Sequence, residues 1–204
     1  MISLAEVLEL RKQVVLKGKA QPGFSTLKKK VPKNEYLRAK YLDKKDVINS
    51  GAIADADVEV LYGLVQQYRP TTIIEIGTWF GTSAMVMDKA AEGKATIYTC
   101  DKNSVYVYDS PSVRYYNKMS DRFLDKMVRH GVKADFVFAD ASIRVGDVAR
   151  ILNATTKDFV FVTHDYVEGL KGWKYMRELE AALPGVQAVQ PRQDSCVAYA
   201  EIHR

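Results

Sequence analysis

The chain has 204 residues, of which 47% are hydrophobic and 27% charged, a balance that excludes a collagen, a coiled coil and wholesale disorder. A length near 200 favours one main domain that folds without a structural metal or disulfides. Cys100 and Cys196 lie far apart and form no Cys-x-x-Cys pair, which argues against a zinc ribbon and fits a reducing, cytoplasmic setting. No apolar run approaches the ~20 residues of a membrane span, and the first residues do not resemble a signal peptide.

Positive charge is concentrated near the N-terminus. Residues 11–45 hold twelve Lys and Arg against two acids, whereas residues 46–204 carry a net charge of −3. Such a segment either attracts a nucleic acid, a phosphate-bearing substrate or an anionic surface, or is a solvated leader. The sequence therefore predicts a basic N-terminal arm or lid over residues 1–50 and a main domain over residues 51–204.

Helices and strands alternate along the chain. An apolar stripe predicts a first helix over residues 3–17, and residues 20–50 are loop-like, with one helical turn near 34–41. Apolar residues at helical spacing predict further helices over residues 55–68, 82–91, 121–129, 145–152 and 170–183. Short apolar runs predict strands over residues 71–76, 95–100, 113–116, 134–139, 158–163, 186–189 and 196–202.

This alternation predicts the fold class. Strand sequences such as IIEI, FVFA and FVFV are apolar on both faces, as central parallel strands require. We expect a doubly wound α/β fold with a mostly parallel sheet of seven strands, of which the last two form an antiparallel C-terminal hairpin. Ligands bind such sheets at the carboxyl ends of the strands, so the residues that directly follow each strand are the candidates for a site.

The turn after the first strand, EIGTWFGTS at residues 75–83, is the most informative segment. Gly77 and Gly81 permit a close approach of the backbone, and the helix that follows offers free amides to an anionic group. The turn is neither a G-x-G-x-x-G dinucleotide motif nor a P-loop. Asp101 ends the second strand, where a carboxylate suits the two hydroxyls of a ribose. The turn and Asp101 together are a strong signal for a ribose-containing ligand.

A family resemblance rests on these segments. The run IIEIGTWFGTSA followed by YTCDKN resembles motif I and the acidic ribose site of class I S-adenosylmethionine-dependent methyltransferases. FVFADAS resembles their motif IV, and FVFVTHDYV resembles the HDY segment of many bacterial members. The resemblance covers about residues 52–204 and is greatest to small O-methyltransferases related to catechol O-methyltransferase, to cephalosporin-hydroxylase-like proteins and to macrolide sugar O-methyltransferases. It implies S-adenosylmethionine as the cofactor and a small-molecule hydroxyl as the acceptor.

The resemblance also implies roles for single residues. Asp101 would hold the ribose, Ser120 and Asp121 would meet the adenine, and Asp140 would lie beneath the sulfonium and the acceptor. The full set of residues implied in cofactor binding is Glu75, Gly77, Thr78, Trp79, Gly81, Ser83, Asp101, Lys102, Ser120, Asp121 and Asp140.

A second group, Asp140 with His164 and Asp165, follows two neighbouring strands and is predicted to be catalytic. Asp140 and Asp165 suit Mg²⁺, which would bind the acceptor hydroxyl and lower its pKa. The metal-dependent relatives carry Asp-Asn, Asp-Asp or Glu-Asp where this chain has His-Asp, which leaves the third ligand open. Alternatively His164 is a general base in a metal-free site, or it orders the loop.

Three functions remain compatible with the sequence. The first is O-methylation of a small molecule, and the second is methylation of a nucleic acid held by the basic arm. The third is a binding or regulatory protein that kept the fold, or a protein that uses S-adenosylmethionine for another reaction. Neither an Asn/Asp-Pro-Pro-Tyr/Phe motif nor a Pro-Cys nucleophile is present, which disfavours the second. We also expect the arm to close over the pocket or against a second subunit of a homo-oligomer.

Overall fold

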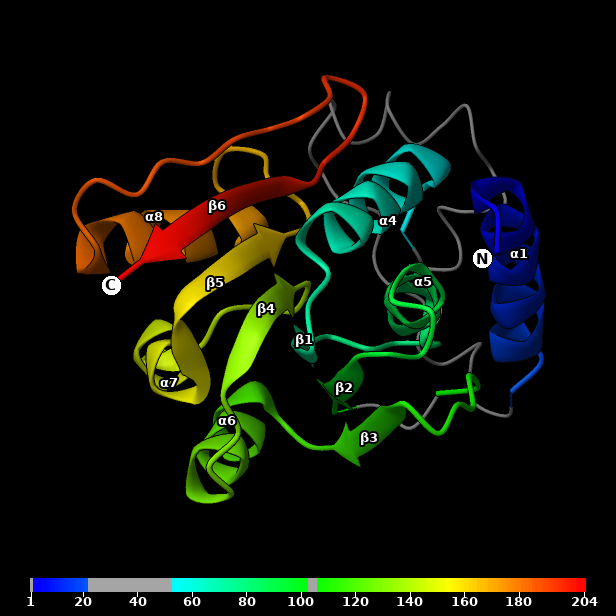
Figure 1. The fold of residues 1–204 in the computed structure, drawn as a ribbon, viewed down its shortest axis with the longest axis horizontal. Helices are drawn as coiled ribbons and strands as arrows, with labels where there is room; N and C mark the ends of the chain where they lie inside the picture. Colours follow the sequence, from blue (N-terminus) through cyan, green and yellow to red (C-terminus); the bar gives the residue numbers. More distant parts are fainter. Residues whose placement is uncertain (1, 22–52, 103–105) are drawn as a thin grey trace.

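The computed structural model describes residues 2–21, 53–102 and 106–204. Its centre is one sheet with the strand order β3-β2-β1-β4-β5-β6, in which the first five strands are parallel and β6 runs antiparallel to β5 (Figure 1). The six strands are β1 (Thr72–Ile76), β2 (Thr96–Asp101), β3 (Val113–Asn117), β4 (Ala134–Ala139), β5 (Thr155–Thr163) and β6 (Ala198–His203).

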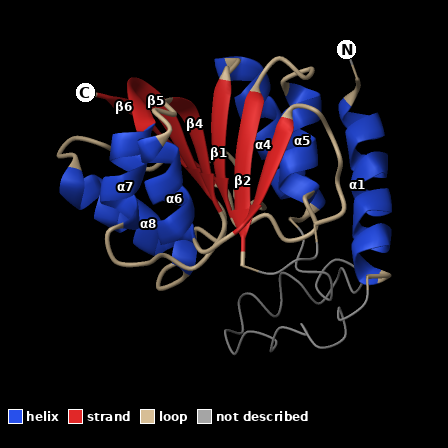
Figure 2. Ribbon diagram, turned by 90° about the horizontal axis from the view of Figure 1, so that it is seen from below, coloured by secondary structure: helices blue, strands red, loops and turns tan. Residues whose placement is uncertain are grey.

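Helices cover both faces of this sheet (Figure 2). One face carries α4 (Asp55–Tyr68) and α5 (Thr82–Ala90), and α1 (Leu4–Lys19) packs on the outer side of these two helices. The other face carries α6 (Ser120–Arg129), α7 (Asp147–Ala154) and α8 (Lys171–Ala182). Successive strand residues point to opposite faces, so Ile73 joins the apolar cluster under α4 and α5 while Ile74 joins the cluster under α6 and α8. The doubly wound, mostly parallel α/β fold expected from the sequence is confirmed.

In the described part of the chain the sheet has six strands rather than the predicted seven. Residues 186–189 form no strand: only Val189 pairs with Tyr199, through two reciprocal backbone hydrogen bonds of 2.8 and 2.9 Å. Val186 and Ala188 instead pack against the apolar cluster beneath α8. The predicted C-terminal hairpin is therefore present, but its first arm is reduced to a single bridge.

Helix α1 belongs to the predicted N-terminal arm and packs against α4 and α5. Ser3 and Glu6 close a capping box at its start, which is a strong start signal. Val7 and Arg11 are both buried on the inner face of the helix. The predicted helical turn near residues 34–41 and most of the basic segment lie outside the described residues. Among the residues that the structure describes, no helix is long and apolar enough to cross a membrane.

Candidate functional site

The turn between β1 and α5 lies against the end of β4. Gly77 has a φ of +102°, and a Cβ there would come within 2.8–2.9 Å of the backbone of Asp140 and Ala141. Only glycine fits such a position, because other residues would need both a left-handed backbone and space that the neighbouring strand fills. The turn and the end of β4 therefore form one continuous surface.

Glu75 anchors this turn from inside. Its side chain is completely buried, and its two carboxylate oxygens accept hydrogen bonds from the hydroxyls of Ser83 and Thr99. The hydroxyls of Thr78 and Thr99 share a further hydrogen bond. Burial raises the pKa of Glu75 to about 7. The acid thus ties the turn to α5 and β2.

Asp101 connects the end of β2 to the same turn. Its Oδ2 accepts a hydrogen bond of 2.9 Å from the backbone amide of Trp79, and Trp79 has a left-handed backbone with a φ of 49°. A non-glycine residue in this conformation marks a position that the surroundings hold in place. The carboxylate therefore fixes both the shape of the turn and its distance from β2.

A cavity of about 500 Å³ opens at the carboxyl ends of the strands, where doubly wound folds bind ligands. Six of the residues that the sequence implicated in cofactor binding line it: Gly77, Trp79, Asp101, Lys102, Ser120 and Asp140. Five others do not: Glu75, Thr78, Gly81, Ser83 and Asp121. Lys171, which the sequence analysis did not single out, also lines the cavity.

The residues outside the lining have other neighbours. A Cβ on Gly81 would come within 2.6 Å of the ring of Tyr106 and 2.9 Å of Tyr108, so these tyrosines lie over the end of the turn. Asp121 forms an ion pair of 3.6 Å with Arg144, which lines the cavity. Thr78 and Ser83 are buried with Glu75, as described above.

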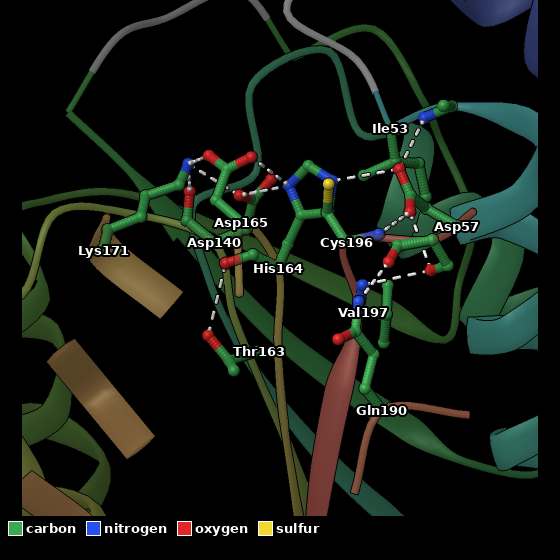
Figure 3. Close-up of polar contacts among 12 residues, drawn as sticks. Ile53, Asp57, Asp140, Thr163, His164, Asp165, Lys171, Gln190, Cys196 and Val197 are labelled. Atoms are coloured by element: carbon green, nitrogen blue, oxygen red, sulfur yellow. Dashed lines mark hydrogen bonds and ion pairs between the residues drawn. The ribbon is translucent and has the colours of Figure 1, made fainter. Parts of the chain in front are cut away.

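The predicted catalytic residues belong to one partly buried network of charges (Figure 3). Nδ1 of His164 lies 2.9 Å from Oδ1 of Asp140 and 3.5 Å from Oδ1 of Asp165. Nζ of Lys171 lies 2.6 Å from Oδ1 of Asp140 and 3.2 Å from Oδ2 of Asp165. The structure therefore brings Asp140, His164 and Asp165 together as the sequence predicted, and adds Lys171.

The other side of the imidazole meets Asp57, on α4. Nε2 of His164 lies 3.1 Å from Oδ2 of Asp57, and Oδ1 of Asp57 accepts hydrogen bonds of 2.8 Å from the hydroxyl of Ser195 and the amide of Cys196. Although burial alone would raise it, the charge and hydrogen bond of His164 lower the pKa of Asp57 to about 2.

The carboxylates around His164 also determine its charge. Burial by itself disfavours the imidazolium, but Asp140, Asp165 and Asp57 outweigh burial and raise the pKa of His164 well above its usual value. Burial alone would raise the pKa of Asp140, but the positive charges of Lys171 and His164 outweigh burial and lower it. The network accordingly holds three carboxylates and two cations.

Asp57 and Lys171 are the site residues that sequence reasoning missed. Asp57 lies in the first turn of a helix, where an acid is expected for its favourable interaction with the helix dipole. This common role of an acid gave no reason to expect its contact with His164. Lys171 begins the helix that follows the HDY segment. The closeness of Lys171 to the HDY segment in the sequence was the signal that could have identified it as a site residue.

Comparison with known proteins identifies the fold. No protein-family model and no curated protein sequence matches this chain. Cofactor-bound Rv0187 from MTB has a TM-score of 0.66 at 14% identity, over 98% of this chain and 90% of that one. The O-methyltransferase TomG from Streptomyces achromogenes, involved in tomaymycin synthesis and solved with S-adenosylmethionine, has a TM-score of 0.62 at 17% identity, over 85% and 92%.

A third solved structure agrees with these two. The O-methyltransferase from Bacillus cereus, in complex with S-adenosylhomocysteine, has a TM-score of 0.59 at 16% identity, over 85% of this chain and 93% of that one. The chain thus has the fold of the class I S-adenosylmethionine-dependent O-methyltransferases, as the sequence resemblance implied.

Proposed function

We propose that this protein is an S-adenosylmethionine-dependent methyltransferase that methylates an oxygen of a small molecule. The observation that carries the proposal is the hydrogen bond between Asp101 and the amide of Trp79, which holds the glycine turn and the acidic strand end together beside the cavity. The TM-scores to structures solved with S-adenosylmethionine or S-adenosylhomocysteine support the same cofactor.

The described residues fit such a cofactor. A cavity of about 500 Å³ is of the size that small-molecule sites have. A carboxylate accepts several hydrogen bonds, so Asp101 can take a ribose hydroxyl beside the amide of Trp79. When bound, the cofactor supplies an electrophilic methyl group on a sulfonium. The chain's own part is to bind this group, to orient the acceptor and to exclude water.

Asp140 and Lys171 are the two members of the charge network that line the cavity. We assign them to the acceptor, because the carboxylate of Asp140 can accept a hydrogen bond from a hydroxyl group while the ammonium of Lys171 keeps a positive charge beside the hydroxyl oxygen. His164 has a carboxylate near each ring nitrogen, which favours an imidazolium that keeps its proton. His164 then positions Asp140. Of the roles that the sequence offered for His164, that of a general base is therefore disfavoured.

Calorimetry with S-adenosylhomocysteine tests the cofactor assignment. We expect micromolar binding by the wild-type chain, about −8 kcal/mol, and at least a ~10-fold loss in Asp101→Ala, since a hydrogen bond to a charged group contributes roughly 1.5–3 kcal/mol. Asp109→Ala, an exposed acid that does not line the cavity, is the matched control. No binding by the wild type, or equal binding by all three proteins, contradicts the proposal.

A further inference from the structure

The side chain of Lys171 fills the space between the two carboxylates that the sequence offered to a divalent cation. Its Nζ lies 2.6 Å from Oδ1 of Asp140, 3.2 Å from Oδ2 of Asp165 and 2.6 Å from the backbone oxygen of Asp140. An ammonium has three N–H donors and no acceptor. Three oxygen atoms from two acidic residues therefore match the three donors, and Mg²⁺ would need the same oxygens.

The imidazole of His164 is also unsuited to a metal. Asp140, His164 and Asp165 place one potential ligand atom each within 4.8 Å of one another, but a ligating histidine presents one ring nitrogen to the metal and donates from the other. Here Nδ1 faces Asp140 at 2.9 Å and Nε2 faces Asp57 at 3.1 Å. Both nitrogens are placed to donate, so the imidazole offers no lone pair to an ion.

The position of Lys171 is fixed by the backbone beside it. A Cβ on Gly172 would lie 2.1 Å from the backbone oxygen of His164 and 2.8 Å from the hydroxyl of Thr163. The first turn of α8 can therefore touch the end of β5 only because residue 172 is glycine. This contact delivers the lysine side chain, which is 21% exposed, to the carboxylates instead of to solvent.

We propose that the ammonium of Lys171 takes the place of a divalent cation between Asp140 and Asp165, so that this site works without a metal. A dication would have to displace the ammonium of Lys171, which lies between the carboxylates of Asp140 and Asp165. The inference rests on the proposed function, which assigns the cavity next to Asp140 to the acceptor. The oxygen of the acceptor would there lie beside the fixed positive charge of Lys171.

The test measures binding of Mn²⁺ alone to the full-length chain by electron paramagnetic resonance. We expect no saturable site tighter than roughly 1 mM in the wild type, because a divalent cation gains little where its carboxylate ligands are already paired. Lys171→Met should bind Mn²⁺ at least ~10-fold more tightly, since Asp140 and Asp165 then lose their cation. Lys174→Met, an exposed lysine on the same helix, should behave as the wild type.

Two results would overturn the inference. One is a wild-type Mn²⁺ site tighter than roughly 1 mM that Asp165→Asn removes. The other is a folded Lys171→Met protein, verified by circular dichroism, that binds Mn²⁺ no better than the wild type. Binding of S-adenosylhomocysteine in the presence of a chelator is measured beside these. Absence of this binding both with and without the chelator would contradict the proposed function. Loss only when the chelator is present would instead count against a metal-free site, which the Mn²⁺ measurements on Lys171→Met test separately.

Discussion

The Nε2 atom of His164 lies 3.1 Å from the carboxylate of Asp57, a residue 107 positions earlier in the chain. The same carboxylate accepts hydrogen bonds from Ser195 and Cys196. Asp57 therefore joins three segments: the helix that precedes the sheet, the end of β5 and the loop that leads into β6. The charge network at the cavity depends on a helix that contributes no residue to the cavity lining.

Replacing Asp57 with alanine should destabilise the protein by about 3–5 kcal/mol, because the buried imidazole of His164 would lose one of its three carboxylate partners. Urea unfolding measures the change as a lower midpoint. Glu59→Ala on the same helix removes a partly exposed ion pair with Arg192 and should cost at most about 1 kcal/mol. If the two variants lose equal stability, the contact with His164 contributes nothing to folding.

The sequence predicted the elements whose signals are local. The run that includes Ile73 and Ile74 is apolar on both faces, which identified a central strand, and the glycine turn after it identified the fold. Asp57 was missed because its partner His164 comes from a distant element. Lys171 was missed because a lysine at the start of a helix gives no sign of its contact with Asp140. The strand predicted over residues 186–189 was wrong, because an apolar segment can bury its side chains by packing under a helix as well as by pairing in a sheet. The binding roles of the site residues stay predictions.

Glu75 should make the stability of the protein depend on pH. Burial raises its pKa from 4.5 to about 7, so the folded state holds this proton more tightly than the unfolded chain. The resulting stability is complete below about pH 4.5 and is lost as the pH rises through about 7, a total on the order of 3 kcal/mol.

Glu75→Gln isolates this effect, because glutamine cannot titrate and can still exchange hydrogen bonds with the hydroxyls of Ser83 and Thr99. The unfolding free energy of the wild type minus that of the variant should fall by about 3 kcal/mol between pH ~4.5 and ~8. Urea titrations at four or five pH values measure it. A difference that does not change with pH would show that the carboxyl is already ionised in weak acid.

Two glycines inside helices should respond to alanine in opposite directions. At Gly172 the added methyl group would press on the backbone oxygen of His164, and the helix would have to move, at a cost of about 1–3 kcal/mol or more. At Gly63, which is exposed on α4 and has no atom within 4 Å of the added Cβ, alanine should stabilise by up to about 1 kcal/mol. Thermal unfolding of the pair measures both effects, and a Gly172→Ala protein as stable as the wild type would refute the close contact.

Arg11 should hold α1 against the start of α4. Its guanidinium is almost fully buried, donates from Nε to the backbone oxygen of Ile53 at 2.8 Å and from Nη1 to Asp55 at 2.8 Å. Arg11→Ala removes these charged hydrogen bonds at a cost of about 2 kcal/mol, so α1 should be undocked roughly 30-fold more often. Thermolysin, which cuts beside apolar residues, should then cleave within residues 2–21 correspondingly faster while residues 53–204 stay intact.

The control is Lys12→Ala, which removes only an exposed ion pair with Glu9 and should leave the rate of cleavage unchanged. Equal cleavage of both variants would mean that the apolar contacts of Val7 and its neighbours hold the helix without Arg11.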